Sequence, residues 1–158
     1  MSIPLSQAHP VAWQNPVLLR AFAALPAAPA WDATPIEQNI AFGQEIILTF
    51  TYTRLAVGGA FDFQIQTSIY SIAALVPAGM NEWETESLYA AGAVAAGADS
   101  QSRIQREYQT YQATLGVAES FSFGPMNING AERIRVFARE SGVPGSPGSL
   151  GIAMEVSA

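Results

Sequence analysis

The chain of 158 residues is as long as one typical domain and long enough to bury a core of its own. It carries thirteen acidic and seven basic side chains, for a net charge of −6 at pH 7, and it has no lysine, which argues against nucleic acid as a partner. The absence of cysteine excludes disulfides, thiolate catalysis and cysteine-based zinc sites.

Only 13 % of the residues are charged, whereas charged residues typically make up about a quarter of a globular domain. Much of the surface is therefore expected to be interface with other subunits. No apolar run reaches the roughly 18 residues of a membrane span, so no membrane contact is predicted. The first basic residue, Arg20, lies inside an apolar run that prolines interrupt, and no secretory signal is predicted.

Residues 1–35 differ in composition from the rest of the chain, because they contain six of its ten prolines. We expect them to form an extended N-terminal arm, and residues 36–158 to form one domain. Asn15 and Pro16 are a good helix start, and no breaker follows before Pro26, so one short helix is predicted in the arm.

The predicted helix has an apolar stripe, and a tryptophan lies on each side of it in the sequence. Such a stripe has to be covered, so the arm is expected to dock on its own domain or on a neighbouring subunit. Its role is then attachment to partners rather than fold stability. The residues of this predicted contact are Trp13, Leu18, Leu19, Phe22, Leu25 and Trp31.

From residue 46 the hydrophobic period changes to two, as in a half-buried strand. Residues 46–53 and 61–69 alternate around a turn with two glycines and predict an antiparallel hairpin. Further strands are predicted at 121–123, 132–140 and 150–156. Six to eight short strands indicate an all-β fold, an antiparallel β-sandwich with the jelly roll as its favoured form. Residues 100–115 favour a strand only slightly over a helix.

Side chains that usually carry out catalysis are scarce. The one histidine, His9, lies between Ala8 and Pro10 in the predicted arm, a poor position for activating a serine. There is no lysine for a Schiff base, and no phosphate-binding loop of the GxxxxGK[ST] type. A mechanism with two carboxylates stays formally open, but no pair is singled out. We predict no enzymatic activity and no cofactor.

The acidic cluster at 82–86 has two interpretations. On a strand, Glu82, Glu84 and Glu86 would share one face, with Trp83 and Thr85 on the other. Three carboxylates on one face could bind Ca²⁺, which prefers oxygen ligands. Such a face is more often solvated charge that blocks unwanted pairing of an edge strand. The second interpretation is favoured, and no metal site is predicted.

Three of the seven arginines, Arg133, Arg135 and Arg139, share one face of the predicted strand 132–140, opposite an apolar row. Cross-strand pairing with acids of the same sheet is the simpler interpretation. The alternative is recognition of an acidic neighbouring subunit, for which the rigid fork of the guanidinium is suited. These arginines are therefore included among the candidate interface residues.

Aromatic residues outside the arm, such as Trp83, Tyr70 and Tyr89, could stack on sugar rings. Burial in the core or in a subunit interface is the simpler interpretation, because tryptophan is common at interface hot spots. Exposure distinguishes the two roles, since a sugar-binding platform has to be accessible to its ligand.

A charge-poor, acidic β-sandwich without lysine or cysteine, preceded by an arm rich in proline and alanine, resembles the capsid-decoration (cement) proteins of tailed bacteriophages. The matching parts are the arm Met1–Pro35 and the sandwich from about Ile36 to Ala158. The resemblance implies a homotrimer that binds the major capsid protein or another virion protein and does no chemistry. It also implies a place on the capsid surface of the virion, after synthesis in the host cytoplasm without a signal peptide.

Two other functions stay open. One is a carbohydrate- or receptor-binding β-sandwich module, which should be a monomer with an exposed aromatic row. The other is a small subunit of a tail or of another extracellular assembly. A decoration protein should instead self-associate and bind a particle.

Overall fold

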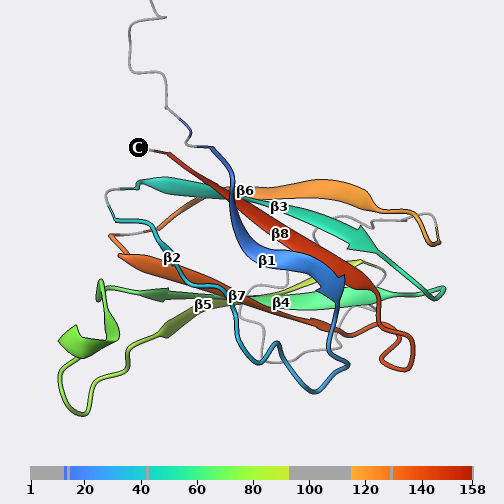
Figure 1. Ribbon diagram of the computed structural model, residues 1–158, viewed down its shortest axis with the longest axis horizontal. Coiled ribbons are helices and arrows are strands. Elements are labelled where there is room, and N and C mark those ends of the chain that lie inside the picture. The colour runs from blue at the N-terminus through green and yellow to red at the C-terminus, as the bar shows by residue number, and fades with distance from the viewer. Residues whose placement is uncertain (1–12, 14, 42, 93–114, 129, 158) are drawn as a thin grey trace, which may run out of the picture.

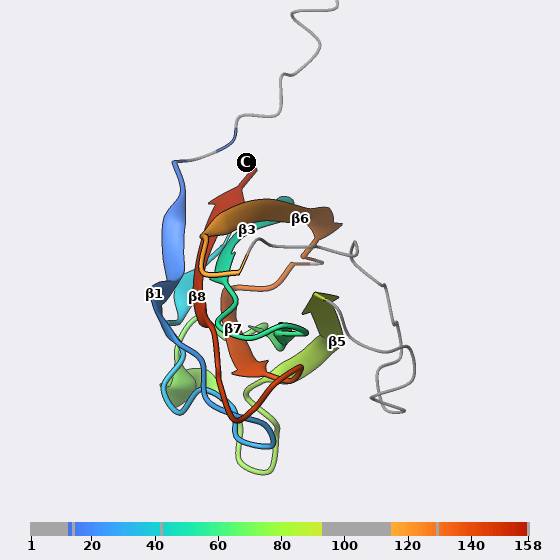
Figure 2. The same ribbon diagram turned by 90° about the vertical axis from the view of Figure 1, so that its right-hand side faces the viewer.

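The computed structural model describes residues 13, 15–41, 43–92, 115–128 and 130–157. They form two antiparallel sheets that pack face to face, with strand orders β1-β8-β3-β6 and β2-β7-β4-β5 (Figures 1 and 2). A short 3-10 helix, η2 (Ala73–Leu75), lies between β4 and β5. The strands are β1 (Val17–Ala24), β2 (Gln38–Asn39), β3 (Glu45–Thr53), β4 (Ala60–Ser68), β5 (Glu84–Gly92), β6 (Glu119–Asn127), β7 (Arg133–Glu140) and β8 (Ser149–Val156).

The strands pair in reverse order along the chain: β1 with β8, β2 with β7, β3 with β6 and β4 with β5. Successive pairs alternate between the two sheets, so the doubled-over chain is rolled around a single core. This is the topology of a jelly roll. The prediction of an all-β, antiparallel sandwich is confirmed.

Alternation along β3 and β4 builds the core between the sheets. The inward side chains of β3 are at most 1 % exposed, and they are Ile46, Leu48, Phe50 and Tyr52. The ring of Phe50 meets that of Phe63 from β4, with 4.5 Å between the centroids. Burying one side chain of this size stabilises the fold by about 1.5–3 kcal/mol. The period-two pattern thus identified the buried face correctly.

The predicted hairpin between residues 46–53 and 61–69 is wrong, although both strands exist. β3 pairs with β6 and β8, whereas β4 pairs with β5 and β7, so the two strands lie in different sheets. Each strand has one apolar row, and the rows bury each other best when they face across the core. The connection at 54–59 therefore crosses from one sheet to the other.

The predicted short helix after Asn15 is also wrong, because Val17–Ala24 form strand β1, which pairs antiparallel with β8. The apolar residues do not share one face: Leu19 and Leu25 are buried, while Leu18 and Phe22 are 49 % and 54 % exposed. A helix of about nine residues is marginal in isolation. The edge of β8 supplies backbone hydrogen-bond partners for β1, and the local helix propensity of these residues takes no account of them.

The segment between β1 and β2 stays on the sandwich. Leu25 donates its backbone N–H to Gly148, Ala28 to Glu140 and Asp32 to Ala138, with N to O distances of 2.8, 2.9 and 3.2 Å. Residues 17–35 are therefore part of the β-sandwich rather than an arm separate from it. Of the predicted arm, residues 1–12 and 14 lie outside the described residues, and His9 with them.

Apart from Leu115, the ambiguous segment 100–115 lies outside the described residues. No helix in the described part of the chain is long and apolar enough to cross a membrane.

Candidate functional site

Strand β7 alternates as predicted. Ile134, Val136 and Ala138 have no exposed surface, and the arginines point to the outer face of the sheet. On that face β7 lies beside β4, where Arg135 is opposite Gln66 and Arg139 is opposite Asp62. The arginines thus lie above polar and acidic groups of their own sheet.

Arg133 is the most enclosed of the three, with 8 % of its surface exposed. Its Nη1 atom lies 3.0 Å from the carboxylate of Glu37, and its Nη2 atom lies 2.6 Å from that of Glu82. Its Nε atom donates to the backbone carbonyl of Tyr70 at 2.7 Å. Every nitrogen of this guanidinium is therefore used within the chain.

Arg135 lies between two aromatic rings, 4.2 Å from the ring centroid of Trp83 and 4.9 Å from that of Phe137. Its Nε atom donates to the side-chain oxygen of Gln66 at 2.8 Å. Burial lowers the pKa of Arg135 from its ordinary value, and the carboxylates of Glu37 and Glu82 oppose that shift. The guanidinium of Arg135 is therefore bound by two aromatic rings and the amide of Gln66, in addition to the nearby carboxylates.

Arg139 binds Asp62, with its Nε atom 3.0 Å from the carboxylate. The guanidinium also lies 4.1 Å from the ring centroid of Trp31 and donates to the carbonyl of Pro29 at 3.3 Å. Trp31 therefore contacts its own chain. Docking on the same domain was one of the two roles predicted for this residue. Arg139 therefore has the cross-strand pairing with an acid of its own sheet, whereas Arg133 pairs with two acids that lie just before β2 and β5, and Arg135 bonds to the amide of Gln66.

The aromatic residues are not laid out as an open platform. Trp83 carries two guanidinium groups on its ring, because Arg133 lies 4.8 Å from the same centroid as Arg135. Tyr70 uses its backbone carbonyl to accept from Arg133. The side chain of Tyr89 lies outside the described residues. Trp83, the candidate for sugar stacking, therefore already has two guanidinium groups against its ring.

The acidic cluster is divided between different roles. Glu82 pairs with Arg133, whereas Glu84 is exposed at the start of β5. The side chain of Glu86 is not among those described. In the described part of the chain, no group of three or more histidine, aspartate, glutamate or cysteine side chains could hold a metal ion.

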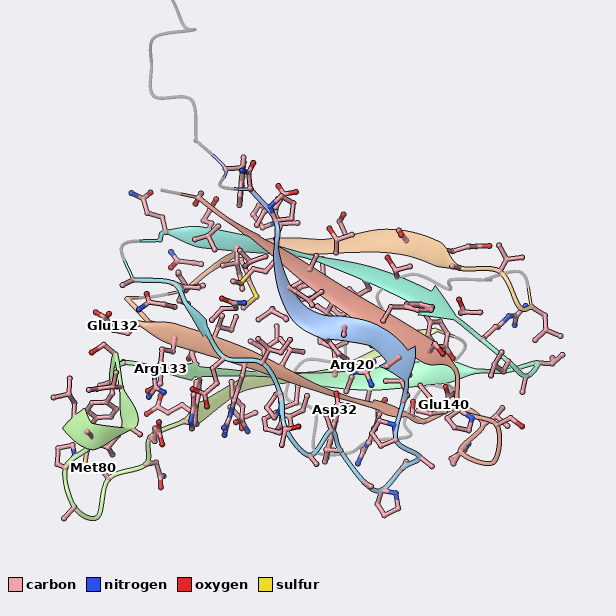
Figure 3. The ribbon with its side chains drawn as sticks, viewed as in Figure 1. Arg20, Asp32, Met80, Glu132, Arg133 and Glu140 are labelled. Atoms are coloured by element: carbon pink, nitrogen blue, oxygen red, sulfur yellow. The ribbon has the colours of Figure 1, made fainter. Side chains whose placement is uncertain are left out.

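A clasp between Arg20 and Asp32 was missed by sequence reasoning. Nε and Nη2 of Arg20 lie 2.9 and 3.1 Å from the two carboxylate oxygens, and Figure 3 shows the side chains together. Arg20 also donates to carbonyls of β1 and to that of Leu150 in β8, and Asp32 accepts from the N–H of Ala138 at 3.0 Å. The sequence feature that could have indicated this ion pair is the position of Arg20 inside an apolar run.

Glu140 was missed as well, although alternation from Ile134 places it on the buried face. It has no exposed surface and forms no ion pair with a described residue. Its oxygens accept from Tyr52 Oη at 2.9 Å and from the N–H groups of Ala60, Gly148 and Val143 at 2.8, 3.0 and 3.2 Å. With four donors in place, this carboxylate holds the β7–β8 loop.

The large exposed apolar side chains among the described residues gather at three places. One lies along β1, where Leu18 and Phe22 point outward from the edge strand. The second is the end of the sandwich with the β3–β4 connection, and the third is the opposite end with the β4–β5 connection (Figure 1). The members are Val17, Leu18, Phe22 and Ile36 for the first, Leu55, Val57, Leu115 and Val117 for the second, and Ile69, Ile72, Leu75 and Met80 for the third.

The exposure of the remaining candidate interface residues shows which of them a partner could contact. Leu18 and Phe22 are exposed and available for a partner, whereas Leu19 has no exposed surface and belongs to the core of its own chain. The interface assignment of Leu19 is therefore corrected, because β1 directs that side chain inward. Trp13 is half-buried and forms a β-bridge with Ser157 at the end of β8.

A pocket of about 480 Å³ opens beside the third patch. Ile69, Tyr70 and Met80 supply apolar surface, and Glu82 and Glu84 supply carboxylates. Met80 lies at the tip of the protruding β4–β5 connection in Figure 3. A volume of this size accommodates several side chains of a partner or one small ligand.

The outer face of the first sheet has little charge along most of its length. Thr49 and Thr51 of β3 lie beside Ser122 and Ser120 of β6, and the hydroxyls of Thr51 and Ser120 are 2.9 Å apart. Gly151 of β8 lies under Phe22 of β1, since a Cβ atom there would come within 3.3 Å of that side chain. Away from Glu45 and Glu155, the outward positions of β3 and β8 are uncharged.

No protein-family model matches the chain, and no curated protein or solved structure matches it either.

Proposed function

We propose that this protein is a non-enzymatic structural subunit of a virion, which decorates and stabilises the capsid of a tailed bacteriophage. It acts by binding further copies of itself, with a trimer as the favoured assembly, and by binding the major capsid protein or another virion protein. The jelly roll occurs in viral capsid proteins, but lectins and cupins share it, so the fold alone does not select a function.

The observation that carries the proposal is the grouping of exposed apolar side chains into three patches on a chain with 13 % charged residues. Large contiguous apolar patches are uncommon on soluble monomers and mark interaction sites. Val57 is 81 % exposed and Ile69 is 67 % exposed, and both lie in connections rather than strands. Side chains placed in this way cost free energy in water unless a partner covers them.

The state of the ionisable groups also supports a role without chemistry. Arg20, Arg133 and Arg139 form ion pairs inside the chain, and the carboxylate of Glu140 has four donors. A catalytic acid, base or nucleophile needs a reactive atom directed at a substrate. These arginines and Glu140 instead hold the segments between strands against the two sheets.

A carbohydrate- or receptor-binding module is the second candidate, and one observation favours it. The lining of the pocket beside the third patch includes Tyr70 together with the polar residues Asn81, Glu82 and Glu84. Polar groups around an apolar floor are typical of small-ligand sites. The covered ring of Trp83 argues against an aromatic platform next to it.

The proposal is tested by light scattering coupled to size exclusion, over a concentration range from micromolar to submillimolar. We expect a mass that is a multiple of the 16.8 kDa monomer. In parallel, the protein should sediment with capsid shells assembled from the major capsid protein of the genome that encodes it. A monomer at every concentration that does not sediment with shells, but binds a glycan array, would establish the second candidate instead.

A further inference from the structure

The second and third apolar patches lie at opposite ends of one strand. The 54–58 loop precedes β4, and the 69–83 connection follows it. The strand has nine residues, which at about 3.4 Å per residue separates its ends by roughly 27 Å. Figure 1 shows the two connections at the two ends of the sandwich. A single molecule cannot bring these two surfaces into contact.

The 54–58 loop projects an apolar tip next to a cation. Leu55 is 58 % exposed and Val57 is 81 % exposed. The Nε atom of Arg54 is buried without a hydrogen-bond partner, and Arg54 forms no ion pair with any residue that the structure describes. Gly116 donates its N–H to the carbonyl of Arg54 at 3.0 Å. This end therefore offers aliphatic side chains and a positive charge that has no partner among the described residues.

The opposite end has the complementary features. The pocket of about 480 Å³ has Ile69 and Met80 in its lining, which are 67 % and 60 % exposed. Glu82 and Glu84 contribute carboxylates to the same lining. Glu82 is engaged by Arg133, whereas Glu84 is exposed and has no ion pair with a described residue. This end offers a cavity lined by both apolar and polar residues, and one available negative charge.

We propose that the 54–58 loop of one copy of this chain binds the pocket at Met80 and Glu84 of a second copy. Val57 and Leu55 then cover Ile69 and Met80, and Arg54 approaches Glu84. The inference rests on the self-association in the proposed function and specifies the two surfaces that carry it. Contact between like ends is disfavoured, because it would bring Arg54 against Arg54 or Glu84 against Glu84.

The contact is heterologous, so an open assembly keeps one unused loop at one end and one unused pocket at the other until a ring closes. A trimer is then a ring of three identical loop-to-pocket contacts, and a rotation that does not close gives open chains. This geometry predicts behaviour that a two-fold interface cannot produce. Two variants, each blocked at a different end, should still bind each other once.

The experiment uses Val57→Asp, which blocks the loop, and Met80→Asp, which blocks the pocket. Both side chains are more than half exposed, so the fold should survive, and circular dichroism melts check this. Each variant alone should run at the monomer mass of 16.8 kDa, and an equimolar mixture should give dimers and nothing larger. Ser122→Asp, at an exposed position of β6 outside the three patches, is the control and should assemble as the wild type does. Leu18→Asp, at a residue that is 49 % exposed, tests the first patch.

Charge reversal tests the polar part of the contact. Arg54→Glu alone and Glu84→Arg alone should each weaken association about tenfold or more, and the double variant should recover most of the loss. Recovery in the double variant requires that the two side chains meet. Absence of recovery, with folded single variants, would contradict a contact between Arg54 and Glu84.

The outcomes separate this inference from the broader proposal. If the wild type is monomeric throughout, self-association fails and the inference fails with it. If the wild type assembles but Leu18→Asp rather than the end variants dissociates it, only the inference is overturned. It is also overturned if Met80→Asp abolishes binding to capsid shells or to glycans while self-association stays intact, since the pocket then serves another partner.

Discussion

The hydroxyl of Tyr52 donates a hydrogen bond of 2.9 Å to the carboxylate of Glu140 inside the core, where neither residue is more than 1 % exposed. Tyr52 belongs to β3 in one sheet and Glu140 ends β7 in the other. The same carboxylate accepts from the backbone at both ends of the β7–β8 loop. This pair therefore joins the two sheets and fixes the loop that connects them.

Removal of the Glu140 carboxylate should destabilise the fold strongly. Glu140→Ala leaves the hydroxyl of Tyr52 and three backbone N–H groups without their acceptor, and each buried unsatisfied group costs about 1–3 kcal/mol. We expect a loss of at least about 3 kcal/mol in the free energy of unfolding, measured by urea denaturation. Glu155→Ala, at a partly exposed acid of β8, is the matched control and should change stability little. Equal effects of the two variants would contradict the assigned role.

The stability of the wild type should fall at alkaline pH because of Tyr52. Burial raises the pKa of Tyr52, and the neighbouring Glu140 raises it further. The unfolded chain releases this proton near pH 10 while the folded chain keeps it, so stability is fully present below that pH and is lost above it.

The loss should be about 1.4 kcal/mol per pH unit above pH 10. Urea denaturation of the wild type and Tyr52→Phe at pH 9 and pH 11 measures it, and the variant should lack this part of the decrease. Tyr52→Phe should also lose about 1.5–3 kcal/mol at neutral pH, the contribution of a hydrogen bond to a charged group. Parallel pH profiles for the two proteins would show that Tyr52 is ionised as easily in the folded state as in the unfolded one.

Reversal of the charge at Arg135 should affect the fold rather than assembly. Arg135→Glu removes the bond to Gln66 and both aromatic contacts, and it places a carboxylate near Glu37 and Glu82. We expect the free energy of unfolding to fall by about 2 kcal/mol, with the melting temperature lowered and the assembled mass unchanged. Arg135→Gln should have a smaller effect. An unchanged melting temperature with loss of assembly would instead support recognition of an acidic neighbour.

Deletion of residues 1–35 should prevent folding, in contrast to an arm that serves only for attachment. The deletion removes β1, the buried Leu19 and Leu25, and the clasp between Arg20 and Asp32. A deletion of residues 1–12 leaves all eight of the described strands in place and should retain a cooperative melt. A folded product of the larger deletion would show that β8 tolerates an open edge.

Local pattern determined the β class, the buried faces of β3 and β4 and the outward direction of Arg133, Arg135 and Arg139. These features follow from the period of two, which each strand carries in its own residues. The same alternation also placed Glu140 inward, although only the structure supplies its four donors.

Pairing between distant segments was decided by tertiary structure alone. Residues 17–24 have the composition of a short helix, yet they form a strand because β8, about 130 residues later, offers an open edge. β3 and β4 read as a hairpin, yet they face each other across the core because their apolar rows are buried best in that way. The jelly roll pairs strands in reverse order along the chain, so its partners are fixed by closure of the whole core rather than by any local signal.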